Sequence, residues 1–148
     1  MKKYLIALSF LMFLLSPAAV SAQGITCNVH HQLIHHGDTI TSGYHFSMEN
    51  GKGVLKVHGR IESDGKRNVI SRNIIFDYQL ENGMYHAKSK DLRLIPVDDV
   101  PDTLLAKHYP AFFYQPDKEI TFSLTKVRNG SWLISFVSTP LFYCNKAA

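Results

Sequence analysis

The segment Asn68–Leu80 is the longest stretch of this 148-residue chain in which side chains alternate between two faces. One face is almost entirely apolar, the other is largely polar, and turn-forming residues bound the segment at both ends. This alternation predicts a half-buried antiparallel strand whose apolar side faces a core. Arg72 is the exception, because it places a charged guanidinium group on the side that should be dry. The residues of the inward face are Ile70, Arg72, Ile74, Phe76, Tyr78 and Leu80.

The first 22 residues have the composition of an export signal. Lys2 and Lys3 precede the apolar run Leu5–Leu15, and Val20-Ser21-Ala22 follows the small-x-small rule for cleavage. We expect cleavage before Gln23, with retention of residues 1–22 as a membrane anchor as the alternative. The remaining 148 − 22 = 126 residues suffice for a single domain, residues 23–148.

The net charge does not indicate a nucleic-acid partner. The formal net charge is +4, and it falls to 4 − 2 = +2 when Lys2 and Lys3 are removed with the signal. The remaining basic residues are interspersed with acidic ones instead of clustering in a block. We therefore expect no nucleic acid among the partners.

Two cysteines, Cys27 and Cys144, lie near the two ends of the mature chain. In an exported protein such a pair predicts a disulfide, here closing a loop of 144 − 27 = 117 residues. Two free thiols would require a reducing compartment, which conflicts with the export signal. A metal site built on both cysteines is disfavoured because no CxxC spacing is present.

The rest of the chain alternates strand patterns with turn residues, interrupted by one helical pattern at residues 98–109 with Asp98 or Asp99 as its cap. We expect an all-β fold with one short helix, an antiparallel meander closing into a small lipocalin-like barrel. Closure would remove the exposed edges, and the cysteine pair would join the first and last strands. A two-sheet β-sandwich is the alternative. The apolar faces predict the following cross-strand neighbours: Leu33 with Ile40, Met48 with Leu55, Ile61 with Ile70, and Tyr78 with Tyr85.

In this register Arg72 lies opposite Gly59 on one side and Asp91 on the other. The turn at Glu81-Asn82-Gly83 also allows a two-residue slip, which would make Asp91 a diagonal neighbour of Arg72 on the same face. A buried arginine requires a partner or a bound anion, so Arg72 and Asp91 are predicted to form an internal ion pair. The glycine would leave room for the long side chain. The structural interpretation is that the pair fixes the strand register. The functional one is that Arg72 binds the acidic head of a fatty acid or bile-type ligand.

Several histidines near the start of the mature chain are weak candidates for a surface copper or zinc site. A polar hairpin with solvated imidazoles explains them as well, because no HxH or HExxH spacing is present. The sequence also lacks a GxSxG motif, a phosphate loop and a recognisable pair of acid–base carboxylates. We therefore predict no metal, no cofactor and no enzymatic activity. The candidate ligands are His30, His35, His36 and His45.

The run ISRNIIFDY at residues 70–78, DDVPDTLL at 98–105, and the closing P-x-x-x-C at 140–144 with Cys27 resemble the FidL-like family of small bacterial inner-membrane or periplasmic proteins. The resemblance covers most of the mature chain. Members tend to be encoded beside membrane-bound transcriptional regulators, in an arrangement similar to the ToxR/ToxS type. There the small partner is a lipocalin-like barrel that completes the regulator's periplasmic domain. The cleavable N-terminus of this chain departs from the anchor that the family commonly keeps.

The resemblance implies a periplasmic accessory protein that binds and stabilises or modulates the sensor domain of such a regulator. The alternative is a stand-alone carrier or sensor of a small apolar acid, such as a fatty acid or bile salt. A regulator partner predicts an unpaired strand edge or an apolar outer patch near the terminal strands. A carrier predicts a large inner cavity with Arg72 at its wall.

Overall fold

The computed structural model describes residues 24–137 and 141–147. The predicted signal peptide, residues 1–22, lies outside this part. Within the described residues, no helix has the length and apolar character required to cross a membrane. The eight strands are β1 (Ile25–His35), β2 (Asp38–Glu49), β3 (Lys52–Ser63), β4 (Lys66–Glu81), β5 (Met84–Leu94), β6 (Glu119–Lys126), β7 (Trp132–Phe136) and β8 (Phe142–Lys146).

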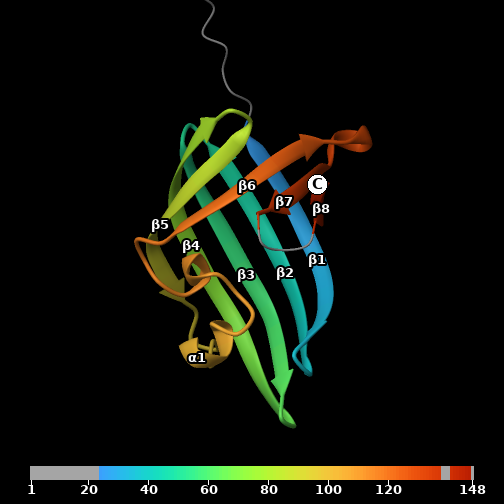
Figure 1. Ribbon diagram of the computed structural model, residues 1–148, viewed down its shortest axis with the longest axis vertical. Helices are drawn as coiled ribbons and strands as arrows, with labels where there is room; N and C mark the ends of the chain where they lie inside the picture. Colours follow the sequence, from blue (N-terminus) through green and yellow to red (C-terminus); the bar gives the residue numbers. More distant parts are fainter. Residues whose placement is uncertain (1–23, 138–140, 148) are drawn as a thin grey trace, which may run out of the picture.

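Each strand pairs antiparallel with the next, and β8 returns to β1, so the sheet is a closed barrel (Figure 1). The predicted antiparallel meander and its closure are thereby confirmed, and the alternative β-sandwich is wrong. The connector between β5 and β6 carries the short helix α1 (Asp102–Leu105) and the 3-10 turn η1 (Ala111–Phe113). A second 3-10 turn, η2 (Arg128–Gly130), joins β6 to β7.

The first four hairpins are joined by two-residue turns in which both residues have positive φ. This is the geometry of type I′ turns, which Asn-Gly and Asp-Gly favour because those residues tolerate the left-handed region. Leu33 lies opposite Ile40 as predicted. The turn residues are His36-Gly37, Asn50-Gly51, Asp64-Gly65 and Asn82-Gly83.

The predicted register of the second and third hairpins is wrong by two residues, because both were given turns that were too long. Met48 lies opposite Gly53, and Gly59 lies opposite Ile70. In the fourth hairpin Tyr78 lies opposite Ala87, which is the two-residue slip that the sequence left open. A slip of two residues leaves every side chain on its predicted face, which is why the alternation did not reveal the error. Gly59 is required for a different reason from the predicted one: a Cβ atom there would collide with the carbonyl oxygen of Thr41.

A β-bulge interrupts the pairing of β4 with β5. Ile75 lies opposite Asp91 and the next residue, Phe76, lies opposite Ser89, so Lys90 is the extra residue. A bulge of one residue reverses which face the following side chains occupy. Ser89 precedes the bulge, points inward like Ala87 and is fully buried, whereas Asp91 follows the bulge and is therefore exposed.

The predicted helix over residues 98–109 is reduced to the single turn of α1. The two acidic residues expected to cap it bind β4 instead. Asp99 accepts a hydrogen bond from the backbone N–H of Val69, and Asp98 accepts one from that of Ser71. These bonds satisfy backbone groups of β4 near the end of β5, so the carboxylates were not available as helix caps.

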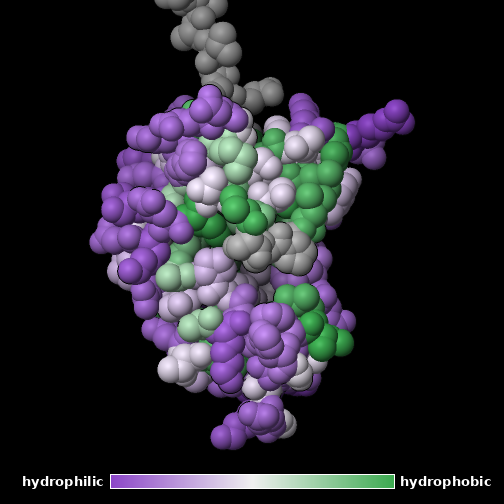
Figure 2. Space-filling view, in the orientation of Figure 1, coloured by the Kyte–Doolittle hydropathy of each residue, from purple (hydrophilic) through white to green (hydrophobic). Residues whose placement is uncertain are grey.

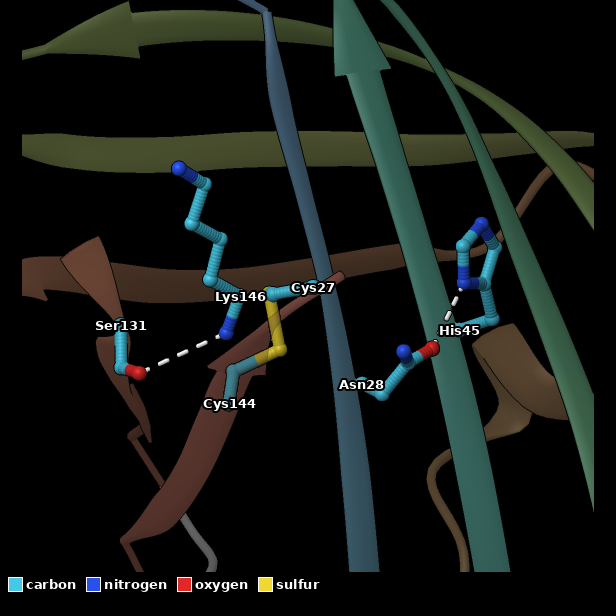
Figure 3. Close-up of a disulfide and its surroundings, with 6 residues drawn as sticks. All are labelled: Cys27, Asn28, His45, Ser131, Cys144 and Lys146. Carbon is cyan, nitrogen blue, oxygen red and sulfur yellow. Dashed lines mark hydrogen bonds between the residues drawn. A yellow bond between two sulfur atoms is a disulfide. The ribbon is translucent and has the colours of Figure 1, made fainter. Parts of the chain in front are cut away.

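The predicted disulfide between Cys27 and Cys144 is confirmed, and both residues are fully buried (Figure 3). Close to it, β1 and β8 pair through Cys27 with Lys146 and Asn28 with Asn145. In the described part of the chain these are the pairs that close the barrel. The disulfide therefore adds a covalent link between β1 and β8, the two strands with the shortest pairing in the barrel.

Candidate functional site

The interior around Arg72 is filled and its charge is neutralised. The Nη2 and Nε atoms of Arg72 donate to the two carboxylate oxygens of Asp98 at 2.6 and 2.9 Å. The two side chains are 2% and 0% exposed. Apolar and aromatic groups from β3, β4 and the connector enclose the pair, leaving no volume that a water molecule could occupy. A buried ion pair with this two-pronged geometry is a structural unit. The enclosing residues are Val57, Ile70, Leu105, Tyr109 and Phe113.

The predicted partner of Arg72, Asp91, is wrong. Asp91 is exposed and pairs with Arg93 on the outer surface, with 2.9 Å between Oδ2 and Nε. The bulge at Lys90 is the physical reason, because it turns Asp91 outward. Asp98 follows β5 in the connector, where strand periodicity no longer indicates which way a side chain points.

An apolar cavity lies beside the lower half of β1, where the barrel interior approaches the surface. It contains about 40 Å³ of space accessible to a water-sized sphere. Sites for drug-sized ligands have volumes of about 300–1,000 Å³. As it stands, the cavity accommodates water but no fatty acid or bile salt. Its lining includes His31, Leu33, Ile40, Tyr44, Tyr109 and Phe142.

The polar side chains that line this cavity are His31, His108 and the two tyrosines Tyr44 and Tyr109. Burial lowers the pKa of His31, and its buried Nδ1 atom has no hydrogen-bond partner among the described residues. Burial raises the pKa of both Tyr44 and Tyr109, and Tyr109 shares a hydrogen bond of 2.9 Å with Ser42. At neutral pH the shifts therefore favour the uncharged forms of His31, Tyr44 and Tyr109.

The edge of β1 is open along the same stretch. Among the described residues, β8 pairs with β1 at Cys27 and Asn28, and no strand pairs with that edge of β1 over residues 29–35. Phe142 of β8 still packs against His31, with ring centroids 4.8 Å apart. The two strands therefore remain in side-chain contact where their backbones no longer pair. Backbone groups on an open edge can pair with a strand from another chain.

Large apolar side chains are exposed beside this opening. Figure 2 shows hydrophobic surface over β7 and β8, and a second area over the lower end of β1. The two areas are separate in this view and lie along the open edge, and we call their exposed side chains together the seam surface. It consists of Ile34, Val137, Leu141 and Tyr143, which are 75%, 78%, 58% and 47% exposed.

The four histidines considered as metal ligands are not brought together. His30 projects outward beside His58, and the Nδ1 atom of His45 lies 2.7 Å from Oδ1 of Asn28. In the part of the chain that the structure describes, no group of three or more histidine, cysteine or acidic side chains is arranged around a common metal position. His35 and His36 adjoin each other at the β1–β2 turn, with ring centroids 3.9 Å apart.

One residue of this region was not identified as a candidate from the sequence. His108 follows α1, and its imidazole is fully buried between the β1–β2 hairpin and the connector. Its Nε2 atom lies 2.8 Å from Oδ2 of Asp38, and its Nδ1 atom lies 3.0 Å from Nδ1 of His35. Seventy-three residues separate His35 from His108, so no local spacing could have predicted the contact.

The electrostatics of this group favour the neutral form of His35 and the ionised form of Asp38. Loss of hydration lowers the pKa of His35, and the neighbouring His36 and His108 lower it further. Hydrogen bonds from Ser63 and His108 lower the pKa of Asp38.

The family model described as the YqeJ C-terminal domain matches residues 24–144 of the chain. The comparison with curated proteins found no match. The matched range contains the whole barrel up to the second cysteine of the disulfide.

Proposed function

We propose that this chain, which belongs to the YqeJ C-terminal domain family, is a periplasmic accessory protein without enzymatic activity of its own. It would bind the sensor domain of a membrane-bound transcriptional regulator and stabilise or modulate it. The resemblance to FidL-like proteins beside ToxS-type regulators supplies the class of partner. The disulfide is compatible with an oxidising compartment outside the cytoplasm.

The observation that carries this proposal is the seam surface beside the open edge of β1. Exposed apolar side chains grouped next to an open strand edge are typical of protein–protein interfaces. The patch lies at the terminal strands, where a regulator partner was expected to bind. Strand pairing on β1 would give such a partner backbone hydrogen bonds, and the patch would give it apolar contacts.

The dimensions of the interior favour this role over that of a carrier. A carrier of fatty or bile acids requires a cavity of several hundred Å³ with a charged group available to the ligand. The apolar cavity has about 40 Å³, and Arg72 is neutralised by Asp98. Ligand binding would require the seam to open first.

The proposal is tested by substitution in the seam surface. Leu141→Asp places a charge in the patch, and Leu80→Asp is the matched control, because Leu80 is 56% exposed at a distant hairpin. Each protein is expressed in the native bacterium, crosslinked in the periplasm and purified, and the captured proteins are quantified by mass spectrometry. We expect a membrane-bound regulator with a periplasmic domain, and at least tenfold less of it with Leu141→Asp. Equal recovery by the two variants, or capture without any such regulator, would contradict the proposal.

A further inference from the structure

Two imidazole rings face each other where the β1–β2 hairpin meets the connector that follows α1. The Nδ1 atoms of His35 and His108 are 3.0 Å apart. The side chain of His108 is completely buried, so its ring cannot turn toward solvent without local unfolding. His35 occupies the last position of β1, which is fixed by its pairing with Asp38. The two nitrogen atoms are therefore held close together by two separate parts of the fold.

Asp38 determines which nitrogen of His108 is free. Its Oδ2 atom lies 2.8 Å from Nε2 of His108, and a carboxylate can only accept a hydrogen bond from that N–H group. In the neutral ring the lone pair is then on Nδ1, the atom directed at His35. A carboxylate that holds the far nitrogen of an imidazole in this way is a recurrent feature of metal-ligating histidines, because it fixes the ring and increases its basicity.

The spacing of the two Nδ1 atoms suits a shared metal ion. Zinc–nitrogen bonds are about 2.0–2.1 Å long, so nitrogens at the observed separation would subtend an angle of about 94° at the metal. A tetrahedral angle needs a separation of about 3.3 Å, which requires only a small movement of His35. The ring of His36, with its centroid 3.9 Å from that of His35, is near enough to approach as a third ligand. An open hollow lined by His36, Asp38, Ser63, Asp64 and Lys107 adjoins the group.

We propose that His35 and His108 form a binding site for a divalent transition-metal ion of the zinc or copper type, with Asp38 orienting His108. Imidazole donors suit such ions better than they suit calcium or magnesium. The ion would replace the proton now shared between the two rings and would join the β1–β2 hairpin to the connector. Water, or His36 after a rotation of its side chain, would complete the coordination. This inference does not depend on the identity of the regulator.

The test uses the untagged mature protein, freed of metal with a chelator, and titration calorimetry with Zn²⁺. We expect one equivalent to bind with a dissociation constant in the micromolar range. His35→Gln should weaken this binding at least tenfold, and Asp38→Asn should weaken it about 10–100-fold. His45→Gln is the matched control, since His45 projects from the outer face of β2 at a distance from this group, and it should bind as the wild type does.

Two further measurements separate a built site from adventitious binding. Co²⁺ absorption bands in the visible region should appear with the wild type and be lost with His35→Gln. The thermal midpoint of each metal-free variant shows whether it is folded, which matters most for Asp38→Asn. Unchanged Zn²⁺ affinity in folded His35→Gln, or no saturable binding below about 100 μM in the wild type, would overturn the proposal and leave a simple hydrogen bond between the rings.

Discussion

Strands β2, β3 and β4 pair with one another along nearly their whole length, whereas β1 and β8 meet over two residue pairs. The first region is an almost continuous ladder with tight turns, and its inward side chains are almost all buried. The second depends on a disulfide, and its outer surface retains large apolar side chains. The first region has its backbone hydrogen bonds and apolar side chains satisfied within the barrel, whereas the second leaves part of the β1 edge unpaired among the described residues.

The two regions also treat polar groups differently. Against β4, the charge of Arg72 is matched by Asp98, which accepts three hydrogen bonds from Arg72 and from the backbone of Ser71. Beside β1, the Nδ1 atom of His31 is buried without a partner among the described residues. Fully satisfied groups indicate a fixed core, and a group left unsatisfied marks a place where the native arrangement is less stable.

The largest expected effect tests the closed region. Arg72→Met and Asp98→Leu should each lower the free energy of unfolding by about 3–5 kcal/mol, because each leaves an uncompensated buried charge. The double variant should recover much of that loss. Urea denaturation followed by circular dichroism measures all three proteins.

The control for this cycle is Asp91→Leu, in which the exposed carboxylate of the surface pair with Arg93 is removed. It should change the stability by no more than about 0.5 kcal/mol. If Asp91→Leu were as damaging as Asp98→Leu, the assignment of the buried partner would be wrong.

A somewhat smaller effect tests the seam. Cys144→Ser should cost about 2–5 kcal/mol, because the bridge closes a loop of 117 residues. Hydrogen exchange should show that protection is lost first in β7 and β8, while β2, β3 and β4 remain protected. Reduction of the wild type should reproduce the change, and reductant should have no further effect on the variant. Uniform loss of protection across all strands would remove the contrast between the two regions.

The smallest effect concerns His31. Replacing it by leucine removes the unsatisfied Nδ1 atom and should stabilise the protein by about 1 kcal/mol, the lower end of the range for such a group because the ring is partly exposed. Thermal melts at pH 7.5 measure this gain. A loss of stability would mean that His31 makes a polar contact essential to the cavity wall.

The acid response of His31 follows from its pKa, which burial lowers below the ordinary value of 6.5. The unfolded chain then binds more protons than the folded one, so stability is lost as the pH falls through this range. His31→Leu should therefore flatten the decline between about pH 7 and 5. The flattening should be partial, since His35 also has a lowered pKa and contributes in the same direction.

The class of fold, the succession of strands, the inward and outward faces of β1 to β4, and the pairing of Cys27 with Cys144 were all predictable from the amino-acid sequence. Alternation specifies which face a side chain occupies because the side-chain period of a strand is two residues. The register of the first hairpin was also predicted correctly, with Leu33 opposite Ile40. The registers of the next three hairpins could also have been predicted, because Asn-Gly and Asp-Gly favour two-residue turns.

The contacts that form the candidate sites depend on how the chain folds in three dimensions and could not be predicted from the sequence. The bulge at Lys90 reversed the faces of the following residues, and one extra residue in a ladder leaves no clear trace in the alternation. Asp98 and His108 lie in the connector, where no period relates sequence position to direction. Their partners, Arg72 and His35, were selected by the closure of the barrel, which brings together groups that are distant in the chain.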